Sequence, residues 1–244
     1  MSDLYATIAA HYDTIFPFDS GKGEFLLSAL PEPPGGMRVL EVGCGTGSLS
    51  VWLAERGCEV VAIDLDAEMI RRAIVKAGDT KGRASFLELN MLDVGVAFAH
   101  ADFDVVACFG NTLVHLEDDR AILHFIRAVR QRLRPGGHLL LQVLNYDYIL
   151  REGIDELPVV ETERLLFRRS YRPTKEPGKI EFGIRLTDKS SNETMEFETM
   201  LHTVGADRLC ALLNEGGFTR VSRFGDYART DFCSDSFSLV VDAV

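Results

Sequence analysis

The sequence predicts an α/β fold in which a mostly parallel β-sheet carries helices on both of its faces. A mainly apolar run at 39–42 leads into glycines at positions 43, 45 and 47, which is typical of a strand that turns sharply into a helix. A second apolar run, at 60–63, ends in Asp64. A later run, at 103–109, is apolar apart from Asp104, as expected for a strand buried on both faces. Three buried strands in this order indicate an open α/β sheet.

The glycine-rich turn indicates a binding site for a nucleotide-like cofactor. Glycine has no Cβ, so the backbone amides of the turn can approach a bound group closely, and the helix that follows adds a partial positive charge at its N-terminus. Asp64 ends the neighbouring strand, where a carboxylate can accept hydrogen bonds from both hydroxyls of a ribose. The two features together predict a cofactor that contains a ribose.

A dinucleotide site is the alternative for the same turn. That site has the pattern G-x-G-x-x-G with an acidic residue about 20 positions further on. Here the third glycine comes one place early, and Ser48 stands where the dinucleotide motif has glycine. A nicotinamide-dependent oxidoreductase therefore stays open as a minor alternative.

Further segments place polar residues at the same edge of the predicted sheet. The segment 87–93 is predicted to be a third strand that runs into an acidic loop, and the strand at 103–109 delivers Gly110, Asn111 and His115 to its carboxyl end. Ligands of open α/β sheets bind at that edge. A helix is expected from Asp118 to Leu133, followed by a Pro-Gly-Gly turn and a fifth strand at 138–144.

Glu41-Val42-Gly43-Cys44-Gly45-Thr46-Gly47, with Asp64 after the second strand, resembles the motif of class I S-adenosylmethionine (SAM) dependent methyltransferases. The resemblance covers most of the first ~145 residues, about the size of one domain. It implies a Rossmann-like, mostly parallel seven-stranded sheet with SAM as the cofactor. It also implies methyl transfer to nitrogen or oxygen of a small-molecule acceptor by in-line displacement, giving S-adenosylhomocysteine. A non-catalytic SAM-binding or interaction protein is a further alternative.

The resemblance also implies which residues form the site. In the family, the acid at Asp93 accepts the adenine amine and the backbone at Leu92 meets the ring nitrogen, while tyrosines of the N-terminal segment close over the cofactor. The residues expected to bind the cofactor are Tyr5, Tyr12, Glu41, Gly43, Cys44, Gly45, Gly47, Asp64, Leu65, Met69, Met91, Leu92, Asp93 and Phe109. Packing of an amphipathic N-terminal helix explains Tyr5 and Tyr12 equally well.

Asn111 and His115 are the candidate catalytic residues. Asn111 follows the fourth strand directly, where its amide can orient the acceptor or help to seat the cofactor. A neutral imidazole at His115 can take a proton near pH 7, which would help a hydroxyl acceptor more than an amine. The alternative for His115 is a histidine at the start of a helix that hydrogen-bonds to the backbone.

The chain is predicted to have three parts, at 1–145, 146–204 and 205–244. The first holds the N-terminal helix and the SAM-binding core, and the last completes the core sheet with a helix and a strand pair. The middle part alternates apolar and polar residues over three runs separated by turns at 173–178 and 188–192. We interpret it as an antiparallel lid of three strands inserted after strand five, over the acceptor site. A dimerisation sheet would show the same alternation.

The alternation in the lid places Arg169 on the apolar side, where a guanidinium requires an anionic partner. That partner is either a protein carboxylate, such as Glu181 or Glu196, or a carboxylate of the acceptor. Arg169 belongs to a cluster of six cations between positions 164 and 179, which indicates an anionic acceptor. The residues expected to bind the acceptor are Tyr146, Arg169 and Tyr171.

Composition narrows the choice of partners. The formal net charge of −11 disfavours nucleic acids, whose binding requires a basic surface. The sequence has no apolar stretch of about 18 residues and no secretory signal, so we expect a cytoplasmic protein that does not bind a membrane. Its five cysteines are scattered and form no C-x-x-C pair, which predicts neither disulfides nor a metal site. The chain is expected to be a monomer or a homodimer.

Overall fold

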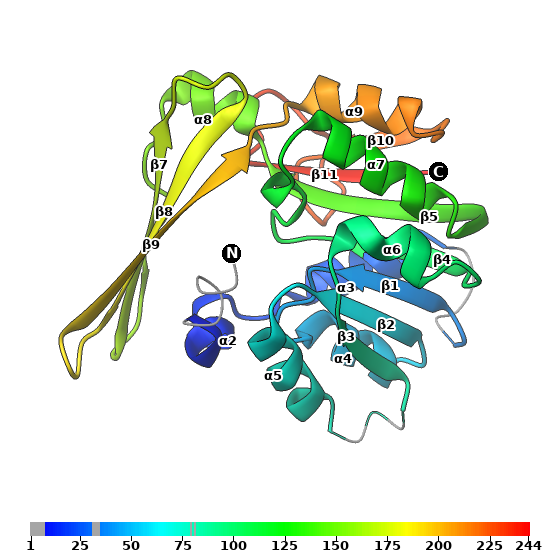
Figure 1. Ribbon diagram of the computed structural model, residues 1–244, viewed down its shortest axis with the longest axis horizontal. Helices are drawn as coiled ribbons and strands as arrows, with labels where there is room; N and C mark the ends of the chain where they lie inside the picture. Colours follow the sequence, from blue (N-terminus) through cyan, green and yellow to red (C-terminus); the bar gives the residue numbers. More distant parts are fainter. Residues whose placement is uncertain (1–7, 31–34, 79, 81) are drawn as a thin grey trace.

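The computed structural model describes residues 8–30, 35–78, 80 and 82–244. Within these ranges the strands form two separate sheets, which stand apart in Figure 1. The larger has seven strands in the order β10-β11-β5-β4-β1-β2-β3, and the smaller has four in the order β6-β7-β8-β9. The predicted α/β fold, with a mostly parallel seven-stranded sheet and a small antiparallel sheet inserted after strand five, is confirmed.

The first five strands of the large sheet run parallel, and the C-terminal pair joins its edge antiparallel. Their bounds are β1 (Arg38–Val42), β2 (Glu59–Asp64), β3 (Ala84–Glu88), β4 (Phe103–Cys108), β5 (Leu133–Leu144), β10 (Val221–Phe224) and β11 (Ser238–Ala243). The strand order reverses between β1 and β4, so a crevice opens at the carboxyl ends of these two strands. That crevice holds the site described below.

Helices cover both faces of the large sheet because alternate strand residues point in opposite directions. Val39 belongs to the core cluster shared with α3 (Ser20–Leu27) and α4 (Ser48–Glu55), and its neighbour Leu40 to the cluster shared with α7 (Asp119–Arg130) and α9 (Ala206–Glu215). Other helical elements are η1 (Ala9–His11), α2 (Tyr12–Ile15), α5 (Ala67–Ala77), η2 (Met91–Asp93), α6 (Val94–Ala97) and η3 (Leu113–His115). No helix in the described ranges is long and apolar enough to cross a membrane.

Two local predictions are corrected. Residues 133–137, expected to be a turn, belong to β5, because the pairing of β4 with β5 jumps from Phe103↔Leu133 to Val105↔His138 and the Pro-Gly-Gly segment lies in the resulting irregularity. The expected N-terminal helix consists, where it is described, of a 3₁₀ turn and the short α2, since the helix ends just before Pro17. Tyr5 lies outside the described residues.

The inserted sheet, which consists of β6 (Val160–Glu161), β7 (Leu165–Pro173), β8 (Lys179–Asp188) and β9 (Glu193–His202), is antiparallel throughout. Three strands were expected, and β6 adds a fourth that is too short to show a sequence period. Along β8 the buried positions alternate, as predicted, at Ile180, Phe182, Ile184 and Leu186. This apolar face packs into the main core cluster together with Ile15 of the N-terminal segment.

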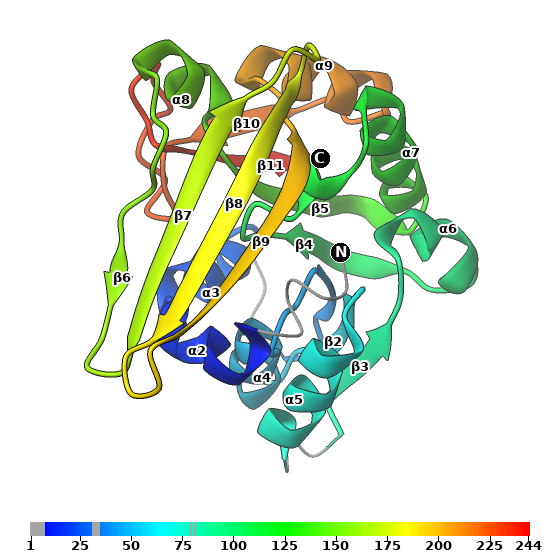
Figure 2. The same cartoon turned by 60° about the vertical axis from the view of Figure 1, so that its left-hand side comes forward.

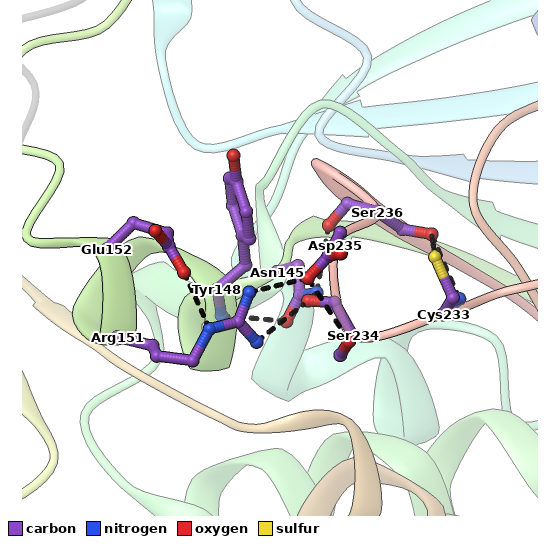
Figure 3. Close-up of polar contacts among 8 residues, drawn as sticks. All are labelled: Asn145, Tyr148, Arg151, Glu152, Cys233, Ser234, Asp235 and Ser236. Atoms are coloured by element: carbon purple, nitrogen blue, oxygen red, sulfur yellow. Dashed lines mark hydrogen bonds and ion pairs between the residues drawn. The ribbon is translucent and has the colours of Figure 1, made fainter.

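The helix α8 (Tyr146–Glu152), which was not predicted, connects β5 to the inserted sheet and is fastened to the C-terminal loop (Figure 3). The Asn145 amide donates to the carbonyls of Ser234 and Ser236, at 3.3 and 2.8 Å, while its side-chain oxygen accepts from the Tyr148 amide at 3.3 Å. Arg151 donates to Asp235 at 2.7 Å. These contacts fix the direction in which the chain leaves the large sheet.

Candidate active site

The glycine turn between β1 and α4 is held against the end of β2. The amides of Gly43 and Cys44 both donate to the carbonyl of Ile63, at 2.8 and 3.0 Å. Gly43 has φ +73°, and a Cβ added there would lie 2.5 Å from Cγ2 of Thr112. Gly45 has φ +53°, and its Cβ would meet the ring of Tyr12 at 3.1 Å. Both positions therefore require glycine.

Asp64 lies at the carboxyl end of β2 and faces the glycine turn. Its Oδ2 accepts the Gly45 amide at 2.8 Å, and its Oδ1 accepts the Asp66 amide at 3.0 Å. Burial raises the pKa of this carboxyl. Each carboxylate oxygen can accept a second hydrogen bond, so Asp64 can both order the turn and receive the hydroxyls of a ligand.

A cavity of about 300 Å³ opens at this point, at the carboxyl ends of β1, β2 and β4. The predicted residues that line it are Tyr12, Gly43, Gly45, Asp64, Leu65, Met69, Met91, Leu92 and His115. Gly110, which the sequence placed at this edge of the sheet, also lines the cavity. Sequence reasoning missed further lining residues, which are Val42, Ile63, Asp66, Leu89, Asn90, Thr112, Leu116 and Glu117. The wall combines thioether and aliphatic side chains with the Asp64 carboxylate and a glycine turn, a set that fits the base, ribose and amino-acid ends of SAM.

Several predicted cofactor residues lie outside the lining. Glu41 is buried and accepts a hydrogen bond from the Ser50 hydroxyl, and burial raises its pKa to about 7. Phe109 packs edge-on against Phe25, with ring centroids 6.4 Å apart. Cys44 is buried, and Asp93 is exposed. Gly47 is also absent from the lining, and a Cβ there would lie 2.7 Å from the Phe86 ring. Their roles toward the cofactor stay predictions.

Two of the missed residues order the turns at the cavity rim. Asp66 caps the N-terminus of α5 by accepting the amides of Glu68 and Met69, at 2.9 and 3.0 Å. Asn90 accepts the Leu92 amide at 3.0 Å and so shapes the turn that carries Leu92. Asp66 could have been found from the sequence, because an aspartate just before a helical run is an N-cap signal.

The two candidate catalytic residues are placed differently. His115 lines the cavity, and burial lowers its pKa to about 4. Asn111 has a left-handed backbone conformation (φ +65°), and both polar atoms of its side chain form hydrogen bonds. Its Oδ1 accepts the Leu144 amide at 3.0 Å, and its Nδ2 donates to the Tyr146 hydroxyl at 2.9 Å. These contacts favour a positioning role for Asn111.

The residues expected to bind the acceptor gather behind the cavity, between the large sheet and the inserted sheet. Tyr146 and Tyr171 are buried and hydrogen-bonded to each other. Arg169 donates to the Pro158 carbonyl at 3.1 Å, and its guanidinium lies 5.6 Å from the ring centroids of Phe16 and Phe167. None of the three lines the cavity.

The protein carboxylates expected to neutralise Arg169 bind other arginines. Glu181 pairs with Arg172 at 2.9 Å, and Glu196 pairs with Arg185 at 2.6 Å. Among the described residues, no carboxylate lies within ion-pair distance of Arg169, and its buried Nε has no hydrogen-bond partner there. Burial lowers the pKa of this guanidinium. The assignment of Glu181 or Glu196 as its partner is therefore wrong.

The described residues contain no group of histidine, cysteine and acidic side chains arranged to hold a metal ion.

Comparison with known proteins agrees with this geometry. A family model for a methyltransferase domain matches residues 39–137. Glycine/sarcosine N-methyltransferase from Halorhodospira halochloris is 26% identical over 90% of this chain and 80% of that protein. The enzyme of the same name from Aphanothece halophytica is 29% identical over 86% and 77%.

A solved structure shows the same fold. A SAM-dependent methyltransferase from Clostridium acetobutylicum superposes with a TM-score of 0.82 over 98% of both chains, at 16% identity. The match to the family model, together with the motif and the site, identifies residues 39–137 as a methyltransferase domain that uses SAM as its cofactor. The nicotinamide alternative is not favoured.

Proposed function

We propose that the enzyme methylates a nitrogen atom of a small-molecule acceptor. The observation that carries the proposal is the state of His115, the base candidate in the cavity, whose pKa is lowered to about 4 by burial. Such an imidazole is neutral at pH 7 but is a weak base for a hydroxyl proton. An amine acceptor needs only to be in its neutral form before transfer. The names of the two matched N-methyltransferases support this choice.

The enzyme mainly has to bind the two reactants, align them and exclude water from the site. When bound, SAM supplies a methyl group on a positively charged sulfur, which is already a good leaving group. Asp64 can receive the ribose hydroxyls while holding the Gly45 amide. Tyr12 covers the turn, and Asn111 holds the Tyr146 hydroxyl in place behind the cavity. No proton has to be taken by a strong base in this arrangement.

The acceptor assignment is tested with matched amine and hydroxyl compounds, following S-adenosylhomocysteine release. For an amine, kcat/KM should rise about tenfold per pH unit below the ammonium pKa of the acceptor and then level off, because only the neutral amine reacts. His115→Gln should keep kcat within about threefold of the wild type, since the imidazole takes no proton. Faster turnover of the hydroxyl analogue, with loss of activity in His115→Gln, would contradict the proposal.

We also propose that the acceptor carries a carboxylate or a similar anion, bound by Arg169. The cationic cluster as a whole does not support this, because Arg164, Arg168 and Arg172 pair with Asp188, with Glu156 and with two other glutamates. Arg169 supports the proposal by itself, because it is half-buried, its guanidinium lies near two aromatic rings, and none of the described carboxylates pairs with it. A buried guanidinium gains most from a paired anion.

Arg169→Met keeps the length and the apolar packing of the side chain and removes its charge. It should raise KM for an anionic acceptor by about 10- to 100-fold, the value of a charge-assisted contact, and leave SAM affinity unchanged. Arg168→Met on the same strand is the matched control, because Arg168 is exposed. If both variants leave acceptor kinetics unaltered, Arg169 has only a structural role.

The division at 1–145, 146–204 and 205–244, with the inserted sheet over the acceptor, is part of the same proposal. Two contacts support it. Phe16, close to the cavity residue Tyr12, packs edge-on against Phe167 of the inserted sheet at 5.6 Å, and Asn111 reaches Tyr146 at 2.9 Å. The first contact joins the inserted sheet to the N-terminal segment beside the cavity, and the second joins the loop after β4 to α8, which leads into the inserted sheet.

A further inference from the structure

Lys76, near the end of α5, connects three segments that are distant in the sequence. Its ammonium donates to Oδ1 of Asp13 at 2.7 Å, to Oγ1 of Thr46 at 2.7 Å and to Oγ of Ser48 at 2.6 Å. An ammonium has three N–H donors, and each has an acceptor here. We call these four residues the Lys76 cluster. They tie the N-terminal segment to the glycine turn and to the first turn of α4.

The Lys76 cluster is a charge-assisted network. Asp13 Oδ1 also accepts the Thr46 hydroxyl at 2.5 Å. Burial raises the pKa of Asp13, but the hydrogen bonds from Lys76 and Thr46 outweigh this effect and lower it overall. The Lys76 side chain is 27% exposed. Because one cation serves three oxygens, the side-chain entropy cost per contact is lower than for an isolated surface pair.

The cluster lies directly beside the residue that covers the cofactor cavity. Tyr12 precedes Asp13 and lines the cavity, with its ring 3.1 Å from where a Cβ of Gly45 would be. Figure 2 shows α2 between α4 and the strands of the inserted sheet. Tyr12 also contacts Phe16, with ring centroids 5.1 Å apart. Asp13 thus anchors the backbone directly next to Tyr12, the residue that lies over the glycine turn.

We propose that Lys76 is a positioning residue for SAM: by holding Asp13 against Thr46 and Ser48, it keeps Tyr12 closed over the cavity and slows cofactor release. Lys76 itself does not line the cavity, so the effect passes through the N-terminal segment. The proposal rests on the assignment of this cavity as the SAM site, and it adds a residue that determines how long the cofactor stays bound.

The experiment measures SAM dissociation from the full-length protein, with excess S-adenosylhomocysteine as displacing ligand and the fluorescence of Trp52, the single tryptophan, as signal. Lys76→Met should release SAM about 3- to 10-fold faster, as expected for loss of a charge-assisted network. KM for SAM should rise while kcat at saturating SAM is kept. Arg71→Met is the matched control on the same helix, because Arg71 is exposed and pairs with Glu68. Arg71→Met should change neither the rate of SAM release nor KM for SAM.

Two double variants separate positioning from a general effect on stability. Asp13→Asn should accelerate release to a similar extent, and the pair Asp13→Asn/Lys76→Met should be no worse than either change alone, because both remove one interaction. In a Tyr12→Ala background, Lys76→Met should lose its effect. If Lys76→Met accelerates SAM release equally with and without the Tyr12 side chain, Lys76 does not act through Tyr12.

Different results would overturn the role of Lys76 and the assignment of the cavity as the SAM site. An unchanged release rate in Lys76→Met and Asp13→Asn, while Asp64→Asn weakens SAM binding, would overturn the role of the cluster and leave the site intact. If Asp64→Asn has no effect either, the cavity is not the SAM site. A lower melting temperature of the SAM-free protein with an unchanged release rate would assign Lys76 a structural role only.

Discussion

Glu41 is a carboxyl group buried beneath the glycine turn, with the Ser50 hydroxyl as its hydrogen-bond donor. Burial raises its pKa from 4.5 to about 7. Between these two pH values the folded protein holds a proton that the unfolded chain has lost. Linkage then requires the free energy of unfolding to fall as pH rises from 4.5 to 7 and this contribution to stay constant above pH 7.

Glu41→Gln should remove that pH dependence, because an amide does not titrate and can still accept the Ser50 hydroxyl. Between pH 4.5 and 7, the unfolding free energy of the wild type should fall relative to the variant by about 3 kcal/mol. Urea denaturation at several pH values measures the difference. Glu55→Gln, at an exposed position on α4, is the control. Parallel profiles for wild type and Glu41→Gln would show that Glu41 is ionised throughout.

At the residue scale, the sequence correctly predicted the positions where the backbone conformation requires a particular residue type. Gly43 and Gly45 have left-handed φ and a side chain in the way, and Asp64 ends its strand beside them, so their spacing alone revealed them. That no carboxylate of the described residues pairs with Arg169 could not be predicted. The alternation shows which face of a strand a residue is on, but not which acid reaches which arginine on the neighbouring strand. Glu181 and Glu196 both have a closer arginine.

At the scale of elements, the start of α8 is the point where the chain leaves the large sheet for the inserted sheet. Asn145 is 2% exposed and serves two purposes there, since it caps α8 and holds two carbonyls of the C-terminal loop (Figure 3). Removing its side chain would leave those carbonyls without their donor.

Asn145→Ala should lower the free energy of unfolding by about 2–4 kcal/mol, from the lost cap and the unsatisfied carbonyls. Arg151→Ala, which breaks the exposed pair with Asp235, should lower the free energy of unfolding much less, because exposed ion pairs are screened by solvent. Thermal and urea unfolding compare the two variants. A cost for Arg151→Ala equal to that for Asn145→Ala would mean that the surface ion pair holds the loop.

In the segment between β5 and α9, the elements that the sequence predicted are those long enough to show a period. The alternation in β7, β8 and β9 spans nine or ten residues each, whereas β6 has two and α8 seven. Residues 133–137 were predicted to be a turn, because Pro-Gly-Gly follows a helix there. Long-range pairing with β4 overrides this local preference and absorbs the segment as an irregularity in β5.

For the whole molecule, the inserted sheet is part of the main core. Its apolar residues, such as Phe167 and Ile184, share a cluster with Ile15, Tyr146 and the residues of the large sheet. An assembly through this face would first have to uncover it, so a homodimer would need to use another surface, such as the edge strand β9. The apolar face of the inserted sheet is therefore better suited to packing on the core than to forming a subunit interface.

The central claim is that SAM binds in the cavity at the carboxyl ends of β1 and β2, and calorimetric titration of Asp64→Asn with SAM tests it most directly. The variant should bind about 10- to 100-fold more weakly, because it loses charge-assisted hydrogen bonds to the ribose. Glu88→Gln is the matched control, since Glu88 pairs in register with Asp64 on β3 but is exposed and lies outside the cavity lining. Unchanged SAM affinity in a folded Asp64→Asn protein would contradict the claim.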